Sequence, residues 1–420
     1  MANKEILFLC HRIPYPPNKG DKIRAFHLLQ GLAEQYTVHL GTFIDAPEDW
    51  AQRPVLDAYC AQTCYRPLAP RWARLRSLAG LLSGQPLSFP YYRDRQLQQW
   101  VNQLLRERPL HAVVVFSSTM AQYVETHGNI RRVLDCVDVD SEKWRQYAQN
   151  AAIPMRWVYA REGRRLLAAE RRLAASFAAT TFVSKAEAEL FCSHAPECAA
   201  RVHAVPNGVD SAYFDPALDH ADPYAGAGSR TMVFTGAMDY RANVDAVQWF
   251  AHDVLPLIRK QQPAAQFVIV GTRPAREVLA LADLPGVHVT GAVADIRPYL
   301  AHAAVAVAPL RIARGLQNKV LEALAMDRPV VLTPEAATGL VPLDAEYAAL
   351  AAEPQALAEQ ILHRLDAGVE RHVAGAARQY VLAHYGWQRQ LTRFTALLER
   401  EGFECGQSIA KDARQAEASA

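Results

Sequence analysis

The sequence predicts an α/β protein made of two doubly wound parallel sheets. Short, strongly apolar segments alternate with helix-spaced segments along most of its 420 residues, and this alternation is typical of strand–helix–strand units. The alternation ends near 202–215 and starts again at 231. A chain of this length also exceeds what one hydrophobic core usually holds, so two domains are expected.

The first half opens with a strand at 5–10, a loop rich in Pro and Gly, a helix over 22–35 and a second strand at 36–44. A helix that joins two short apolar strands is the beginning of a parallel sheet. Further apolar strands are expected at 111–118, 131–138 and 179–184.

The second half contains five segments with the character of buried strands, at 231–236, 266–271, 287–291, 303–310 and 329–333. Helices are expected between them, including one over 244–262. Another helix carries a buried stripe made of Leu316, Val320, Leu321 and Leu324,. The segment 215–229 is rich in Pro, Gly and Asp, which indicates a connection between the halves,.

These elements predict an N-terminal domain over 1–208 and a C-terminal domain over 209–385. A helix over 386–405 follows, and we expect it to pack back on the N-terminal domain. Residues 406–420 are polar and lack periodicity, so a mobile tail is expected,.

Charge is unevenly distributed along the chain. Residues 1–208 hold 26 Lys and Arg against 19 Asp and Glu, whereas the remainder holds 19 against 24. A basic first half indicates an anionic partner, either a membrane surface, a phospholipid-linked substrate or nucleic acid. Aromatic clusters of the RNA-binding kind are missing from the sequence, so no nucleic-acid partner is expected.

Several features of the sequence favour a cytoplasmic protein. The N-terminal segment is too short and too polar-flanked for a signal peptide, and no run approaches the roughly 20 apolar residues of a membrane span. The seven cysteines are scattered without the spacing of a metal site,.

The segment 71–100 mixes arginines with Trp72, Leu75, Leu78 and Leu82 and a Phe-Pro-Tyr-Tyr cluster. Such a basic amphipathic helix is typical of a membrane interface, and it predicts a peripheral protein on the inner face of the plasma membrane. The alternative is a helix packed on the first sheet with a solvated outer face. A second arginine-dense helix, over 155–177, favours a structural or interdomain role.

A cationic helix start is the first candidate site. Arg314, Gly315 and Lys319 gather where a helix begins, and one acid, Glu322, lies a turn further on. Free backbone N–H groups and positive charge at a helix N-terminus bind anions.

Gly236 is the second candidate, because it stands directly between a strand and a helix. A glycine at this point lets the backbone approach a phosphate closely. A tight strand–helix turn also needs a glycine, so this residue decides little by itself.

The order of the motifs is more specific than any one of them. VPNGVD, FTGAMDYRANVDAVQWF, VTGAVADIRPYL and LEALAMDRPVV follow one another along the chain. Together they resemble the group 1 (family 4) glycosyltransferases of the GT-B fold, in which two Rossmann-like domains face each other across a cleft. The resemblance runs from about residue 5 to about residue 400. HRIPYPPNKGDKIRAFHLL, LDCVDVDSEKW and RGLQNKVLEALAM look most like the bacterial sugar transferases of exosortase (PEP-CTERM) and exopolysaccharide loci.

The resemblance implies a nucleotide-sugar donor held mainly by the C-terminal domain. Glu322 matches the glutamate that accepts hydrogen bonds from ribose hydroxyls, and Lys319 would supply charge to the diphosphate. Gly236 and the amides after it would cradle the same phosphates. Val293 lies where the family holds the base by main-chain contacts, and Arg241 is the cation closest to the family's usual basic residue.

One position departs from the family pattern. An acid usually stands eight residues before the glutamate matched by Glu322, and here that residue is Arg314. We therefore expect Arg314 and Lys319 to form a diphosphate clamp with a catalytic role. How the sugar is held, and whether the reaction retains or inverts the anomeric configuration, stay open.

The acceptor is expected in the N-terminal domain. The loop PPNKGDKIR resembles one that faces the donor, where Gly20 allows close approach and Lys19, Lys22 and Arg24 meet an acceptor phosphate. A plain turn capped by Asn18 or Asp21 is the alternative.

Two further residues in this domain are candidates. His11 follows the first strand and either faces the cleft or is structural. Asp138 follows another strand and would orient the attacking hydroxyl or act as base, with Asp135 and Asp140 as close alternatives. Asp138 and Asp140 also imitate a metal-binding Asp-x-Asp pair, but the cationic clamp already neutralises the phosphates, so no metal or other cofactor is expected.

The sequence thus predicts a hexosyltransferase-type glycosyltransferase. It would move a sugar from a nucleoside diphosphate sugar to a hydroxyl of a lipid-linked glycan, in exopolysaccharide or cell-surface polysaccharide biosynthesis. The alternatives are a nucleotide-sugar epimerase on the same fold and a non-catalytic nucleotide-sugar-binding assembly subunit.

Overall fold

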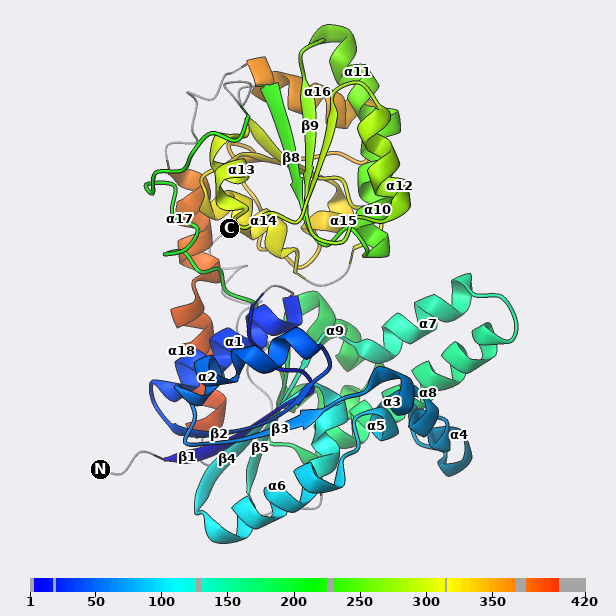
Figure 1. Cartoon of the computed structure of the whole chain (residues 1–420), viewed down its shortest axis with the longest axis vertical. Coiled ribbons are helices and arrows are strands. Elements are labelled where there is room, and N and C mark those ends of the chain that lie inside the picture. The colour runs from blue at the N-terminus through cyan, green and yellow to red at the C-terminus, as the bar shows by residue number, and fades with distance from the viewer. Residues whose placement is uncertain are drawn as a thin grey trace. The chain divides into compact units, whose positions relative to one another are not determined.

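The computed structural model describes residues 4–17, 20–125, 130–224, 230–313, 316–366 and 375–399. The chain forms two compact units (Figure 1). The first unit is Met1–Pro206 with Gln390–Ala420, and the second unit is Asn207–Arg389.

The first unit contains a seven-stranded parallel sheet of order β3-β2-β1-β4-β5-β6-β7. Its strands are β1 Glu5–Cys10, β2 Thr37–Ile44, β3 Gln62–Pro67, β4 Leu110–Phe116, β5 Arg131–Val137, β6 Ala179–Phe182 and β7 Val202–Ala204. The sequence did not predict β3, whose residues are only partly buried at the sheet edge and therefore lack an apolar run.

Helices cover both faces of this sheet, with α1 and α2 on one side and α6 on the other (Figure 1). Their bounds are α1 Gly20–Ala33, α2 Arg53–Asp57, α3 Pro70–Ser77, α4 Ala79–Ser83, α5 Ser88–Tyr91, α6 Arg95–Glu107, α7 Asp140–Asn150, α8 Met155–Ser176 and α9 Lys185–His194. Three 3-10 turns complete the unit, η1 Pro47–Gln52, η2 Ser118–Tyr123 and η3 Pro196–Arg201.

The second unit contains a six-stranded parallel sheet of order β10-β9-β8-β11-β12-β13. Its strands are β8 Thr231–Thr235, β9 Gln266–Val270, β10 Val287–Gly291, β11 Val305–Ala308, β12 Val330–Leu332 and β13 Ala348–Leu350. In both sheets the strand order reverses beside the first strand of the unit, so the prediction of two doubly wound sheets is confirmed,.

The predicted helix over 244–262 is divided into three parts, α10 Arg241–Trp249, a π-helical turn at Phe250–Val254, and α11 Leu255–Gln261. The remaining helices of the second unit are α12 Arg276–Leu279, α13 Arg297–His302, α14 Asn318–Ala325, α15 Pro334–Ala337, α16 Pro354–Asp366 and α17 Ala376–Tyr385, with a 3-10 turn at Ala280–Asp283.

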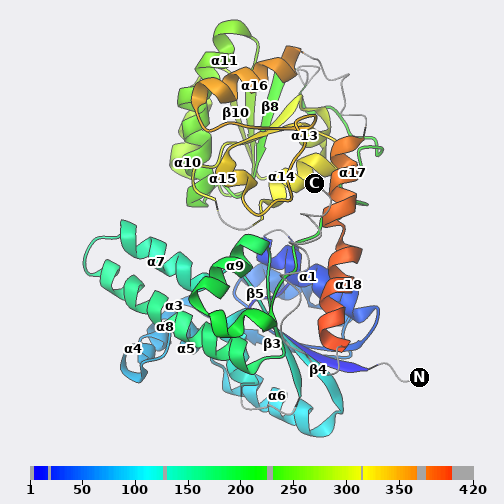
Figure 2. The ribbon, with the colours of Figure 1, turned by 180° about the vertical axis from the view of Figure 1, so that it is seen from behind.

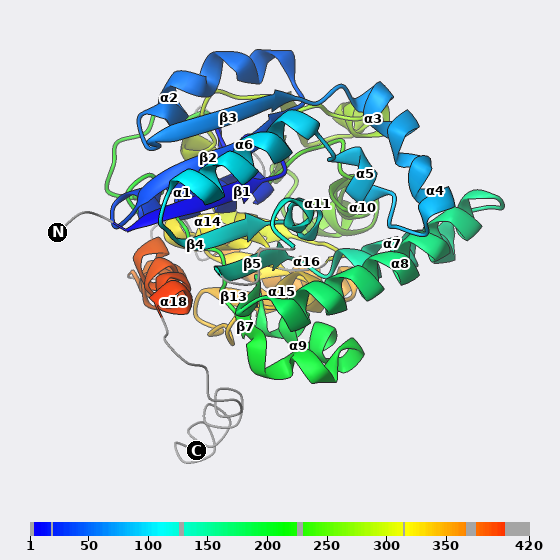
Figure 3. The same ribbon diagram turned by 90° about the horizontal axis from the view of Figure 1, so that it is seen from below.

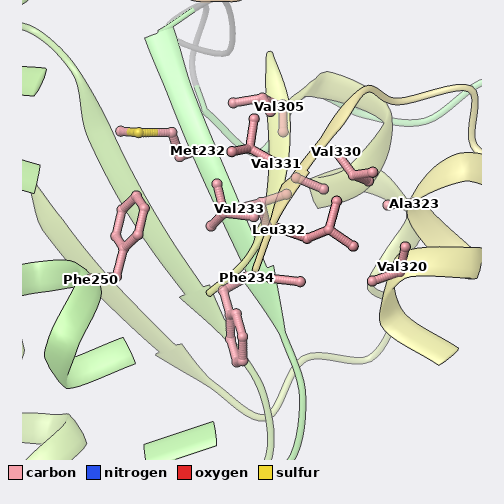
Figure 4. Packing of buried hydrophobic residues seen from close by; sticks show 14 of the residues in the cluster. Met232, Val233, Phe234, Phe250, Val305, Val320, Ala323, Val330, Val331 and Leu332 are labelled. Carbon is pink, nitrogen blue, oxygen red and sulfur yellow. The ribbon is translucent and has the colours of Figure 1, made fainter. Parts of the chain in front are cut away.

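Packing of α14 on the sheet fixes the position of the predicted cationic helix. The predicted apolar stripe is buried, with Val320, Leu321 and Leu324 on α14 and Leu316 just before its first residue. Figure 4 shows Val320 and Ala323 on the side of α14 that faces β12. Full burial of each large aliphatic side chain contributes about 1.5–3 kcal/mol, so the helix start is firmly held against the strand ends.

The connection between the units differs from the prediction. The division falls after Pro206, two residues before the predicted domain boundary at 208, and not within the segment 215–229, which the sequence indicates as the connection. Within this segment, Asp215 pairs with Arg378 at 3.5 Å, and the Tyr224 hydroxyl donates to the Tyr299 carbonyl at 2.7 Å. These contacts tie the described part of the Pro- and Asp-rich segment to the second unit, where it is part of the fold.

The last helix, α18 Trp387–Glu399, begins in the second unit and continues in the first. In the first unit it packs on α1 (Figure 2), where a Cβ on Gly31 would lie 2.3 Å from Leu391. Tyr36 donates to Glu399 at 2.7 Å, and Arg131 donates to the Leu397 carbonyl at 2.7 Å. The predicted tail, 406–420, lies outside the described residues.

The prediction of one amphipathic helix within 71–100 is wrong, because the segment contains several short helices. The segment forms α3, α4 and α5 and the start of α6, because Gly84 adopts a left-handed conformation that ends α4,. Phe89 and Pro90 are buried in the first unit rather than available to a membrane. No helix in the described ranges is both long and apolar enough to cross a membrane.

Candidate functional site

Two glycines bring adjacent strand ends into contact in the second unit. Gly236 follows β8, and its N–H donates to the Val270 carbonyl at 3.0 Å. Gly271 follows β9, and a Cβ on it would lie 1.7 Å from the Gly236 carbonyl oxygen. A side chain at 271 would therefore force the two loops apart. The Gly236 backbone is held at the carboxyl edge of the sheet, where ligands of open α/β sheets bind.

Lys319 of α14 lies beside this glycine loop. A Cβ on Gly236 would lie only 3.2 Å from the Lys319 Nζ. The ammonium donates to the Asn243 Oδ1 at 2.6 Å and lies 4.0 Å from the centre of the Phe234 ring, a cation–π contact. The sequence prediction that Gly236 and Lys319 share a site is consistent with this geometry.

Asn243 is the residue that sequence reasoning missed. It lies in the first turn of α10, is buried, and donates from Nδ2 to the Ala237 carbonyl at 2.9 Å. One amide group thus connects the glycine loop to the Lys319 ammonium. The available signal was an amide among Ala242, Ala246 and Val247, residues of α10 that are all buried, since a buried amide needs hydrogen-bond partners.

The electrostatics of Lys319 and Glu322 are linked. Burial lowers the pKa of the Lys319 ammonium to about 7, although the Glu322 charge acts in the opposite direction. Burial likewise raises the pKa of the Glu322 carboxyl to about 7, against the charge of Lys319. A bound anion would favour the charged ammonium and raise the pKa of Lys319 again.

The structure does not bring the other residues predicted to bind the donor into contact with Gly236 and Lys319 among the residues it describes. Val293 follows β10 and packs against the core of the second unit, but β9 separates β10 from β8. Arg241 is exposed at the first residue of α10. Arg314 and Gly315 lie outside the described residues. Of the two cations in the predicted clamp, the structure therefore describes Lys319 alone.

Among the residues predicted for the acceptor side, His11 lies at the carboxyl end of β1. Its ring stacks on Phe116 with 5.9 Å between ring centres and meets Tyr92 edge-on at 5.6 Å. Its Nε2 is 3.7 Å from the Asp21 Oδ2. Burial alone would raise the pKa of the Asp21 carboxyl, but the interactions with His11 and Arg12 hold it well below its ordinary value.

The prediction that Arg24 meets an acceptor phosphate is wrong. Arg24 is fully buried, and its guanidinium donates to both carboxylate oxygens of Asp135, at 2.7 and 3.2 Å, and to the Val205 carbonyl at 2.9 Å. Lys22 is also buried and donates to Asp49 at 2.7 Å. Gly20 is the exposed first residue of α1, and Lys19 lies outside the described residues.

Asp138 lies just after β5, in a tight turn where its N–H donates to the Cys136 carbonyl at 2.9 Å. Val137 before it has a φ of 67°, a conformation that is costly for a β-branched residue. Asp135 is engaged by Arg24, so Asp138 and Asp140 are the acids that stay candidates at this strand end. Burial raises the pKa of Asp140, with Lys143 and His11 opposing the shift.

A chelating site would need several ligands that converge. In the part of the chain that the structure covers, no group of three or more His, Cys, Asp or Glu side chains is arranged to hold a metal ion. Among the described residues, no third His, Cys, Asp or Glu side chain therefore joins Asp138 and Asp140 in a metal-binding arrangement.

Comparison with known proteins adds to this geometry. Residues 229–367 match the family model described as glycosyl transferases group 1. No curated protein sequence matches the chain.

Several solved structures share its architecture. HepE from Anabaena, crystallised with UDP and glucose, is 14% identical with a TM-score of 0.62, over 94% of this chain and 99% of HepE. Sucrose-phosphate synthase from Thermosynechococcus elongatus is 17% identical with a TM-score of 0.64, over 99% of this chain and 100% of the synthase. A glycosyltransferase from Rickettsia africae is 10% identical with a TM-score of 0.63, over 94% and 98%.

At these identities the structural likeness establishes the fold, and the family match covers the unit that holds Gly236, Lys319 and Glu322. The chain has the GT-B fold, and residues 229–367 of its second unit match the group 1 glycosyl transferase model.

Proposed function

We propose that the protein is a glycosyltransferase that transfers a hexosyl group from a nucleoside diphosphate sugar to a hydroxyl of a lipid-linked glycan. The observation that carries the proposal is the Lys319 ammonium, which Asn243 holds at 2.6 Å beside the glycine loop. A partly desolvated cation at the carboxyl edge of a parallel sheet suits a diphosphate better than it suits a neutral ligand.

In this proposal Lys319 and the amides after Gly236 bind the diphosphate. Its negative charge grows as the bond to the sugar breaks, so a fixed cation stabilises the transition state more than the ground state. Glu322 accepts hydrogen bonds from the ribose hydroxyls, and the main chain at Val293 contacts the base. Arg241 and Arg314 supply further positive charge. The UDP and glucose bound by HepE, which has the same fold, support a donor of this class.

The acceptor hydroxyl is assigned to the carboxyl edge of the first sheet. His11 and Asp138 follow β1 and β5 there, and either could take the hydroxyl proton. We place the reaction in exopolysaccharide or cell-surface polysaccharide biosynthesis, on the cytoplasmic side of the membrane. The net positive charge of residues 1–208 supports an acceptor that carries a lipid phosphate,.

A thermal-shift panel tests the donor assignment. Nucleosides, nucleoside diphosphates and nucleotide sugars are compared, because a specific ligand stabilises the folded state by mass action. Lys319→Ala should weaken binding of diphosphates about 10- to 100-fold, the range expected for loss of a charge-assisted hydrogen bond, and should leave the matching nucleoside nearly unchanged. Lys260→Ala, on the exposed surface of α11, is the control. Equal losses for diphosphate and nucleoside would contradict the assignment.

Transfer is measured next, by incubating the stabilising nucleotide sugar with a membrane lipid extract and following labelled sugar. Label in the lipid fraction, lost in Lys319→Ala, supports the proposal. Donor binding without transfer to any fraction would identify a non-catalytic assembly subunit instead. Conversion of the free donor to its epimer would identify an epimerase.

A further inference from the structure

Helices α7 and α8 form a hairpin in the first unit that exposes apolar side chains at its turn. Ile153 is 84% exposed, Trp157 77% and Met155 44%. Figure 1 shows the two helices extending away from the sheet with the turn at their far end. Large apolar side chains that gather on an exposed surface indicate a site of interaction with a partner.

A second exposed apolar group lies on α3 and α4. Trp72 is 72% exposed, and Leu75, Leu78 and Leu81 are 58%, 51% and 43% exposed. On short surface helices that contact only water, large apolar side chains are usually buried or are replaced by polar ones. Here they stay outside while Ala73, on the same helix, is buried.

Hydrogen bonds connect the two groups. Arg161 of α8 donates to the Gly80 carbonyl at 2.7 Å, and Glu162 accepts from the backbone N–H groups of Leu87 and Ser88 at 2.7 and 3.1 Å. Figure 3 shows α4 next to α8, as these bonds require. Trp157 precedes Arg161 by one turn of α8, and it lines a hollow with Arg145, Ala148 and Gln149 of α7.

We name this surface the docking face, and it consists of Trp72, Leu75, Leu78, Leu81, Ile153, Met155 and Trp157. Its charges have one sign. The arginines of α3 and of the first half of α8 are Arg71, Arg74, Arg76, Arg156, Arg161, Arg164 and Arg165. The sequence holds no Asp or Glu over 58–93, and the one acid over 143–169, Glu162, is fully buried. A protein partner would have to supply all the matching carboxylates.

We propose that the docking face binds an anionic lipid bilayer. Exposed tryptophans and leucines flanked by arginines are the composition that inserts at the boundary between headgroups and acyl chains. Arginines without acidic neighbours are attracted to anionic headgroups. The hairpin turn extends the contact well beyond the segment 71–100. This inference stands on the first unit alone and does not depend on the donor site.

Vesicle flotation with the full chain tests the proposal. The protein should float with vesicles of phosphatidylcholine containing 30% phosphatidylglycerol and should not float with phosphatidylcholine alone. Binding should weaken as salt is raised, because salt screens charge attraction at the surface. The double variants Trp72→Ser/Trp157→Ser and Arg164→Glu/Arg165→Glu should each lower the partition coefficient about tenfold or more.

The control is the double variant Arg276→Glu/Leu279→Ser, which changes an exposed cation and an exposed leucine on α12 of the second unit. It should float like the unaltered protein. All four positions of the docking-face variants are exposed, and unchanged melting temperatures would verify that they fold.

Two results would overturn the proposal. One is binding that is equal for neutral and anionic vesicles or is unaffected by both double variants. The other is a protein that ignores vesicles but self-associates in sedimentation experiments and loses that association in Trp72→Ser/Trp157→Ser, which would make a second copy the partner. Thermal stabilisation by nucleotide sugars, measured without lipid, shows separately whether the donor site is intact.

Discussion

The Asn243 side chain joins the Lys319 ammonium to the glycine loop through a single amide. Its oxygen accepts from Lys319 Nζ at 2.6 Å while its nitrogen donates to the Ala237 carbonyl at 2.9 Å. The two bonds fix the orientation of the amide, because exchanging oxygen and nitrogen would place donor against donor and acceptor against acceptor. The position of the cation is therefore set from α10 and not only from its own helix.

Two substitutions of Asn243 should distinguish its role in positioning Lys319 from its contribution to the free energy of unfolding. Asn243→Ala removes both bonds and should cost about 1–3 kcal/mol of unfolding free energy, with weaker binding of nucleoside diphosphates. Asn243→Asp keeps an acceptor for Lys319 but adds a negative charge that repels the diphosphate. Its affinity for diphosphates should fall as far as that of Asn243→Ala, or further, while nucleoside binding is retained. Calorimetric titration of both ligands checks this, and a loss of nucleoside binding in the Asp variant would contradict it.

Glu322→Gln should alter recognition of the ribose. The amide is nearly isosteric with the carboxylate but accepts only through one oxygen, so a ribose diol loses one hydrogen bond to a charged group. We expect about a tenfold loss for a ribonucleoside diphosphate and a much smaller loss for its 2′-deoxy analogue. Parallel titration of the two ligands measures the difference. Equal losses for both would mean that Glu322 does not contact the ribose.

Binding of a nucleotide sugar should be strongest near pH 7. Above that pH, Lys319, whose pKa burial lowers to about 7, loses its proton in the free protein, and binding must take the proton up again. Below it, Glu322, whose pKa burial raises to about 7, becomes neutral and accepts the diol less well. Affinity should fall on both sides, by up to about tenfold per pH unit.

Two variants should show which residue causes the loss of affinity on each side of the pH optimum. Lys319→Met should remove the alkaline fall and Glu322→Gln the acid fall. A nucleotide sugar is the suitable ligand, since its diphosphate has no terminal phosphate that titrates in this range. A flat profile in the unaltered protein would show that neither group changes its protonation on binding.

The contrast between Lys319 and Arg24 shows what the sequence could predict. Helical spacing predicted the buried stripe of the helix that carries Lys319, because periodicity is a local property. Arg24 stands in an equally suggestive cationic segment, in the second turn of α1, but its partner Asp135 is 111 residues away. Only the pairing of strands across the sheet brings the carboxylate to it, and no local pattern encodes that.

Asn243 was missed for the same reason. Its function depends on Lys319, 76 residues later in the chain, and an asparagine early in a helix is common without any such function. Gly236 was found more easily, because it stands directly between a strand and a helix and belongs to an ordered series of motifs. The contact between Gly236 and Gly271 nevertheless needed the sheet register to appear.

Gly271→Ala should destabilise the second unit and disrupt the donor site. The added Cβ would lie 1.7 Å from the Gly236 carbonyl oxygen, so the loops must move apart, at a cost of about 1–3 kcal/mol or more. Gly291→Ala is the matched control. That glycine has a φ of 71° with open space around its Cβ, and it should cost only about 1 kcal/mol of backbone strain. Urea unfolding and nucleotide binding measure both variants, and similar behaviour of the two would contradict the close contact.

Arg24→Met should lower the stability of the first unit without a specific effect on any acceptor. The change leaves the Asp135 carboxylate buried without its bidentate partner, which typically costs about 3–5 kcal/mol,. Arg24→Met/Asp135→Leu removes both charges and should be more stable than Arg24→Met, because no isolated buried charge remains. Urea unfolding of the two variants measures the coupling between these side chains. If Arg24 instead bound an acceptor phosphate, Arg24→Met would unfold like the unaltered protein and show a raised KM for acceptor alone, and the double variant would offer no rescue.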